Sequence, residues 1–264
     1  MKTLALGASL LLSVAAVPAH AAFVELYKQD FENPTGFFND GGDVNIFRTV
    51  NQLYGGQPAG FTFAQAFTVE TLRVGGSQAW GTGFLDPQGV AGNHVISMLS
   101  SAEDDQLALA FNVGDADYLN FRLDIASIDL DTWGGPFVAS GGEAPVFRIA
   151  LLDNPGGATG LGGGTPLSQA VVTGTANPLK NTFDWTNVVV PLSTAGHTNG
   201  NVILRIDLLS GGYAAMDNFV VAASDTPGEV PPIPEPGTVA LMLGGLAALG
   251  ATRARQRRAP RAGA

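Results

Sequence analysis

Hydrophobic and polar residues alternate along short segments in the middle of the chain. In "LNFRLDIASIDLD" (119–131), Leu119 and Phe121 fall on one face of an extended strand, while Asn120 and Arg122 fall on the other. A period of two residues is typical of a β-strand with one face in a hydrophobic core and the other in water. The pattern predicts antiparallel sheet, in which such half-buried strands are common.

Segments rich in β-branched and aromatic residues recur at short spacing, separated by glycine-containing turns, and no helical period competes with them. The predicted strands are 23–31, 44–50, 61–74, 94–100, 106–113, 118–133, 145–153, 183–192, 201–209 and 214–223. We therefore expect an all-β fold, an antiparallel β-sandwich of the jelly-roll type, over residues 22–223. The glycine-rich segment 154–168 lacks the Gly-Lys-Ser/Thr ending of a phosphate-binding loop and is expected to be a surface loop.

The first 21 residues have the pattern of a secretory signal peptide. Lys2 precedes an apolar stretch from Leu4 to Val17, and the small residues Ala19 and Ala21 flank His20. Small residues at these two positions are the usual recognition site for signal cleavage. We expect residues 1–21 to be removed after Ala21.

The other end of the chain resembles a short membrane segment. Residues 238–252 are uncharged and would span about 22 Å as a helix, against about 30 Å for a bilayer core. No polar face recurs at helical spacing, which argues against a buried amphipathic helix. We expect a short transmembrane helix and arginine-rich tail over 237–264, after a stiff, extended Pro-rich linker over 224–236. The positive charges that would keep the C-terminus cytoplasmic are Arg253, Arg255, Arg257 and Arg258.

This order of features resembles the PEP-CTERM sorting signal. Pro234, Glu235 and Pro236 are followed by the short apolar helix and then by the arginine cluster. The resemblance implies a protein exported through the inner membrane of a Gram-negative bacterium, held there transiently by the C-terminal helix. It also implies processing by an exosortase-type membrane protease, and a destination in the cell envelope, at the cell surface or in the extracellular matrix.

Charge and cysteine content restrict the function of the exported part. Between Ala22 and Pro236 there are 7 basic and 23 acidic residues, a net charge of −16. Nucleic acid is therefore excluded as a partner, because phosphate contacts need a basic face. The chain has no cysteine, so disulfides, cysteine catalysis and thiolate metal sites are excluded as well.

The exported part also resembles the jelly rolls of carbohydrate-binding modules and MAM-like domains. It opens on "QDFEN" and closes on "YAAMDNFVV", with "FDWTNVVVPL" and "LRIDLL" between them. The resemblance implies that the first and last strands lie side by side and that acidic residues near them hold one structural Ca²⁺. Glu32 and Asp217 would be its side-chain ligands, with Asp30 and Asp43 as weaker candidates. The alternative is that Glu32 and Asp217 accept backbone N–H bonds in turns.

Candidate catalytic residues are few. His94 and His197 do not have zinc-ligand spacing, and there is no Gly-x-Ser-x-Gly nucleophile motif. Asp129, Asp131 and Trp133 share one strand face and could bind a sugar by hydrogen bonds and ring stacking. The alternative is that they form a solvated strand end.

We therefore expect a non-enzymatic exported protein that binds polysaccharide or mediates adhesion. Two alternatives stay open: a jelly-roll enzyme that processes polysaccharide, and a purely structural matrix or ice-binding-type protein. Exposure of Trp80, Trp133 or Trp185 would favour sugar binding, and burial of all three would favour the structural role.

Overall fold

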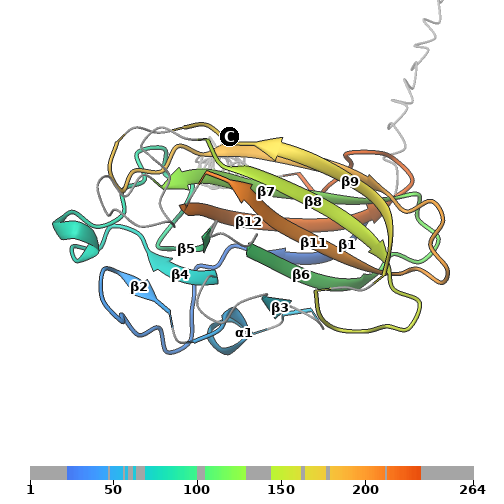
Figure 1. Ribbon diagram of the computed structural model, residues 1–264, viewed down its shortest axis with the longest axis horizontal. Helices are drawn as coiled ribbons and strands as arrows, with labels where there is room; N and C mark the ends of the chain where they lie inside the picture. The colour runs from blue at the N-terminus through green and yellow to red at the C-terminus, as the bar shows by residue number, and fades with distance from the viewer. Residues whose placement is uncertain are drawn as a thin grey trace, which may run out of the picture.

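Two antiparallel β-sheets pack face to face in the computed structural model (Figure 1). The prediction of an all-β sandwich is confirmed. The structure describes residues 23–46, 48–55, 57–58, 62–63, 69–99, 105–128, 144–161, 164–176, 179–211 and 213–232. Its elements are β1 (Val24–Gln29), β2 (Val44–Asn45), α1 (Val50–Leu53), β3 (Thr62–Phe63), β4 (Val69–Arg73), η1 (Ala79–Gly81), β5 (His94–Leu99), β6 (Asp105–Asn112), β7 (Tyr118–Ile128), β8 (Val146–Asp153), β9 (Thr165–Thr173), β10 (Thr186–Ser193), β11 (Asn201–Ser210) and β12 (Tyr213–Ser224).

Strand β12 organises the larger sheet. That seven-stranded sheet has the order β10-β7-β12-β5-β4-β2, and β1 also pairs with β12. The first and last strands therefore lie side by side, as expected. The second sheet has five strands in the order β3-β6-β11-β8-β9.

The alternation of β7 and β11 is visible in the core between the sheets. Leu119 and Phe121 of β7 are fully buried there, as are Leu204 and Ile206 of β11. Phe219 of β12 completes this layer. Burial of these apolar side chains removes them from water and is the main stabilising contribution to the sandwich.

The expectation that the opposite face of β7 is in water is wrong. Along β12, Ala214 and Met216 belong to the core between the sheets, whereas Tyr213 and Ala215 belong to a second apolar cluster on the outer face. Segments 75–93 and 179–185 cover that face and contribute large side chains to it. These are Phe84, Phe183 and Trp185, with the rings of Phe84 and Phe183 stacked 6.0 Å apart.

Three sequence predictions fail locally. The predicted strand 61–74 is divided between β3 of the five-stranded sheet and β4 of the seven-stranded sheet. Strand β9 was not predicted, because its first residues belong to the glycine-rich segment expected to be a loop. The predicted strand 44–50 extends only over Val44–Asn45, and the short helix α1 begins at Val50.

The predicted signal peptide and the helix at 237–264 lie outside the described residues. Among the residues that are described, no helix is long and apolar enough to cross a membrane.

Candidate functional site

Asp217 lies where β12 changes partners. Met216 pairs with Ile96 of β5, whereas Phe219 pairs with Gln29 of β1. The register against β7 shifts between Asp217 and Val220, which is the mark of a β-bulge. Asn218 adopts the left-handed conformation at this point (φ 53°), as asparagine tolerates better than most residues. We call this position the fork.

Asp217 is a buried acid without a cationic partner in the described structure. Asp217 is 1% exposed, and one of its carboxyl oxygens accepts a hydrogen bond from the Asn218 backbone N–H (2.7 Å). Burial, with a smaller contribution from the charges of Glu32, Asp124 and Asp30, raises the pKa of Asp217 to about 9, against the opposing Asn218 hydrogen bond. Four carboxyl groups from β7, β12 and the segment after β1 therefore interact at the fork.

Asp124 is the member of this group that the sequence did not reveal. It lies directly opposite Asp217 in the β7–β12 register. Its two oxygens accept hydrogen bonds from the side-chain amides of Asn187 (2.7 Å) and Asn218 (2.9 Å). Neutral amides hold the carboxylate in place without supplying a positive charge.

Glu32 caps the start of β5. Its carboxylate accepts bonds from the Asn93 backbone N–H (2.9 Å to each oxygen) and from the Asn93 side-chain amide (3.0 Å). A Cβ at Gly92, where φ is +50°, would lie 2.0 Å from a Glu32 oxygen, so glycine is needed for this close approach. Glu32 therefore accepts backbone N–H bonds in a turn, which is the alternative to metal binding. Its negative charge also raises the pKa of Asp217.

The residues at the fork fit a hard cation in charge and donor type. Ca²⁺ is coordinated by six to eight oxygen atoms, mainly from carboxylates and carbonyl groups. Among the described residues, however, no group of three or more Asp, Glu, His or Cys side chains is arranged to hold a metal. Backbone carbonyl oxygens would have to complete such a site.

Asp43, a weaker candidate ligand, is used elsewhere. Its buried carboxylate accepts bonds from the backbone N–H groups of Gln78 (2.6 Å) and Ala79 (2.9 Å) and pairs with Arg73 (2.5 Å). Burial alone would raise its pKa, but these hydrogen bonds and the Arg73 charge outweigh burial and lower it. Asp43 therefore fixes the loop that carries η1.

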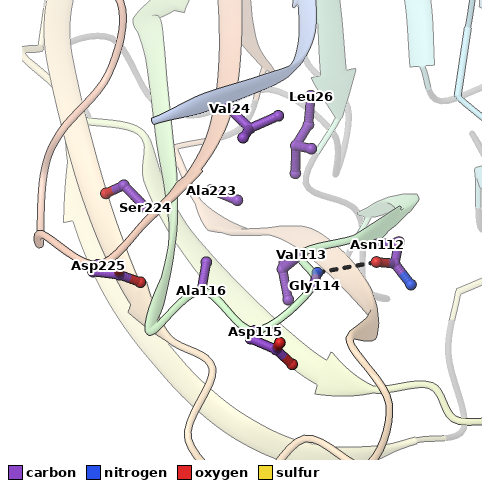
Figure 2. A pocket seen from close by; sticks show the side chains of 10 residues that line it. All are labelled: Val24, Leu26, Asn112, Val113, Gly114, Asp115, Ala116, Ala223, Ser224 and Asp225. Carbon is purple, nitrogen blue, oxygen red and sulfur yellow. Dashed lines mark hydrogen bonds between the residues drawn. The ribbon is translucent and has the colours of Figure 1, made fainter. Parts of the chain in front are cut away.

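A cavity of about 450 Å³ opens at one end of the sandwich, between the β6–β7 turn, the start of β1 and the end of β12 (Figure 2). Its apolar lining is Val24, Leu26, Val113, Ala116 and Ala223, and its polar lining is Asn112, Asp115, Ser224 and Asp225. Figure 2 shows Asp115 and Asp225 across the cavity from Val24 and Leu26. We call this cavity the end pocket.

Some polar residues of the end pocket already form hydrogen bonds within the protein, and others have oxygens left for a ligand. Asn112 is engaged within the protein: it accepts from the Gly114 N–H (3.0 Å) and donates to Asn201 (2.7 Å). Ser224 bonds to Asn120 and Thr226. One oxygen of Asp225 accepts a bond from the Asp117 N–H (3.4 Å). Its other oxygen and the carboxylate of Asp115 are the groups best placed to accept bonds from a ligand, because both residues are exposed. Sequence reasoning missed the end pocket because Asp115 lies in a run that reads as an ordinary acidic turn.

The described side chains of His94, His197 and Trp185 give no second site. His197 accepts a bond from the Gly200 N–H (2.9 Å) through Nδ1, as expected of a loop histidine. His94 is half-buried against the Phe37 ring (centroids 5.1 Å apart), and burial lowers its pKa. Trp185 is buried in the outer cluster and offers no stacking surface.

Several predicted site residues lie outside the described residues, so the structure does not place them. They are Ala19, Ala21, Asp129, Asp131, Trp133, Pro234, Glu235, Pro236, Arg253, Arg255, Arg257 and Arg258. The Trp80 side chain is also outside the described part.

A family model for the PEP-CTERM protein-sorting motif matches residues 232–258. The chain therefore carries this motif over the residues that the sequence pattern indicated. The motif indicates export to a cell-surface or extracellular destination and processing by an exosortase. No curated protein sequence matches the chain.

Solved structures similar to the sandwich include binding modules and adhesin domains. TmCBM61 in complex with β-1,4-galactotriose is 11% identical, with 60% of this chain and 83% of that chain covered and a TM-score of 0.33. The K3 cleaved adhesin domain of Lys-gingipain from Porphyromonas gingivalis is 11% identical, with 76% and 99% covered and a TM-score of 0.36. The CBM22-1–GH10 modules of Clostridium thermocellum xylanase 10B, complexed with xylohexaose, are 14% identical, with 75% and 28% covered and a TM-score of 0.41. We draw no functional conclusion from likenesses at this level.

Proposed function

We propose that this protein is an exosortase-sorted β-sandwich that binds extracellular polysaccharide, as an adhesion or matrix component, without acting on it chemically. The sorting part is supported by the motif at 232–258. The binding part is supported by one observation, the end pocket with two exposed carboxylates opposite an apolar wall.

The end pocket suits a sugar unit in size and chemistry. Its volume of about 450 Å³ is within the usual range for small-ligand sites. Carboxylates accept hydrogen bonds from neighbouring hydroxyl groups, while the C–H face of a sugar ring packs against apolar side chains such as Val24 and Leu26. The net charge of −16 between Ala22 and Pro236 favours a neutral rather than an acidic polysaccharide, because like charges repel.

The proposal of binding without catalysis rests on the groups around the pocket. Glycoside hydrolysis uses two carboxyl groups, one of them a general acid in an apolar setting, whereas both carboxylates of the described lining are exposed to solvent. The competing hypothesis, a polysaccharide-processing enzyme, predicts turnover that depends on Asp115 or Asp225. The structural-matrix hypothesis predicts no glycan binding.

A glycan array probed with the secreted protein tests the proposal. We expect binding to neutral glycans, lost in Asp115→Ala and Asp225→Ala and kept in the control Asp184→Ala, whose carboxyl is remote from the end pocket. Binding that survives both pocket variants would place the ligand elsewhere. Turnover of a bound glycan that disappears in either variant would favour the enzyme.

The sorting part of the proposal has its own test. We expect the mature protein to lack the residues after about Pro236. Replacing Pro234, Glu235 and Pro236 by alanine should leave the protein in the inner membrane of its Gram-negative host. Mass spectrometry of secreted protein that still ends at Ala264 would contradict this assignment.

We also propose one structural Ca²⁺ at the fork, with Glu32 and Asp217 as side-chain ligands. Its positive charge would let the buried Asp217 ionise beside the other carboxylates and would connect the segment after β1 to β12. The support is the buried acid whose pKa is about 9.

A further inference from the structure

The chain does not leave the domain at the end of β12. After Ser224 it turns back, and residues 225–231, which we call the strap, run over the outer face of β7. Asn120 holds the first part of the strap. Its fully buried side-chain amide donates to Ser224 Oγ and to the carbonyl oxygens of Thr226 and Glu229, each at 3.0 Å, and accepts a bond from the Gly228 N–H (2.7 Å).

Arg122 holds the last part of the strap. It lies two residues beyond Asn120 on the same strand face, and its Nη1 donates to the Pro231 carbonyl oxygen (2.6 Å). Arg122 is only 8% exposed, and a guanidinium removed from water is fixed more firmly by such a bond than one on the surface. Two side chains of one strand therefore attach the strap along its whole length.

The attachment at Pro231 limits how far the sorting motif can lie from the sandwich. Pro231 is three residues before Pro234 and five before Pro236. Even a fully extended chain covers at most about 10 Å and 17 Å over these distances. If the strap were released from Ser224, Pro234 could lie about 33 Å from the domain. A membrane protease that reads the motif must therefore work next to the folded sandwich while the strap is attached.

We propose that Asn120 and Arg122 are positioning residues for exosortase processing: they hold the strap on β7, keep the motif close to the sandwich and so slow its cleavage. This inference rests on the proposed sorting of the chain. Detachment of the strap lengthens the spacer and gives the protease access.

Pulse–chase of the full chain, co-produced with its exosortase, measures the rate of tail removal. We expect processing at least threefold faster in Asn120→Ala and in Arg122→Ala than in the unaltered chain. Arg48→Ala and Asn199→Ala are matched controls, since both side chains are exposed and neither contacts the strap, and they should process at the unaltered rate. Phe219→Ala destabilises the core without contacting the strap and should also process at the unaltered rate. Faster processing in Phe219→Ala would show that loss of stability, and not release of the strap, exposes the motif.

A spacer variant keeps the test decisive if the alanine variants fold poorly. Six Gly/Ser residues inserted between Pro232 and Ile233 add roughly 13 Å of flexible reach and leave the strap contacts unchanged. We expect the insertion to accelerate processing and to remove the difference between the unaltered chain and Asn120→Ala. An insertion that changes nothing, or alanine variants that are processed at the same rate or more slowly, would overturn the proposal.

Two further measurements separate this proposal from the sorting assignment. Hydrogen exchange at the Gly228 amide should be slow in the unaltered chain and fast in Asn120→Ala; equal rates would show that Asn120 does not hold the strap. If replacing Pro234, Glu235 and Pro236 by alanine leaves processing unchanged, the sorting assignment fails. If that replacement stops processing while the strap variants have no effect, sorting stands and the positioning role is wrong.

Discussion

Asp217→Asn tests whether one buried carboxyl makes the stability of the sandwich depend on pH. The substitution keeps the size of the side chain and the oxygen that accepts from the Asn218 N–H, and it removes the titration. The pKa of Asp217 is raised from its ordinary value of 3.8 to about 9, mainly by burial. The folded chain without metal therefore keeps a proton between pH 4 and 9 that the unfolded chain releases.

The sign and size of the effect follow from this difference. A group whose pKa is raised by folding stabilises the folded state below its unfolded pKa, and this stability is lost as pH rises towards the folded pKa. At about 1.4 kcal/mol per pKa unit, a shift of about five units sets an upper bound near 7 kcal/mol. We expect on the order of 3 kcal/mol at pH 8, because the effective dielectric constant around protein carboxyls is closer to 20 than to that of a dry interior.

Urea unfolding between pH 4 and pH 8 in excess chelator measures the difference. Asp217→Asn should match the unaltered protein at pH 4 and exceed its free energy of unfolding by about 3 kcal/mol at pH 8. Asp115→Asn, in the exposed turn between β6 and β7, should show no such trend. A difference between Asp217→Asn and the unaltered protein that is constant with pH, or an asparagine variant that is the less stable at pH 8, would refute the reasoning.

Three further predictions concern the fork, the core and the Asp43 loop. Calcium at 100 times its dissociation constant should stabilise the unaltered protein by about 2.7 kcal/mol but not Glu32→Gln or Asp217→Asn, and melting curves that coincide in chelator and calcium would exclude the ion. Phe219→Ala should lower the free energy of unfolding by about 3–5 kcal/mol, because Phe219 is fully buried with ring contacts to Phe31 (5.2 Å) and Phe121 (5.1 Å); a loss below 1 kcal/mol in chemical denaturation would contradict this packing. Gly76→Ala should cost about 1–3 kcal/mol, because its Cβ would lie 2.3 Å from the Asp43 carboxylate, and an unchanged melting temperature would show that the loop adapts freely.

The alternation of apolar residues predicted the strands of the core because burial on one face requires a period of two. It failed at β9 for a physical reason. Pro166 and the preceding glycines are typical of a loop, but β9 is the edge strand of its sheet, where a missing N–H donor is tolerated. Strand position within a sheet depends on long-range pairing, which the local pattern does not contain.

The fork was predicted only in part. The resemblance to jelly rolls placed Glu32 and Asp217 near the ends of neighbouring strands, and their charges do interact. Asp124 could not be predicted, because its position opposite Asp217 depends on the β7–β12 register across more than ninety residues. The end pocket likewise depends on three segments that are far apart in the sequence.

The polar face of β7 is where sequence and structure differ most, and the difference concerns function. In an ordinary half-buried strand, the second face is exposed to solvent, and on β7 that face carries Asn120, Arg122 and Asp124. Here each is buried, and a buried polar group is costly unless it is bonded. Each of the three is bonded: Asn120 and Arg122 to the strap, and Asp124 to two side-chain amides. One strand therefore carries both the attachment of the strap, which leads to the sorting motif, and a carboxylate of the fork.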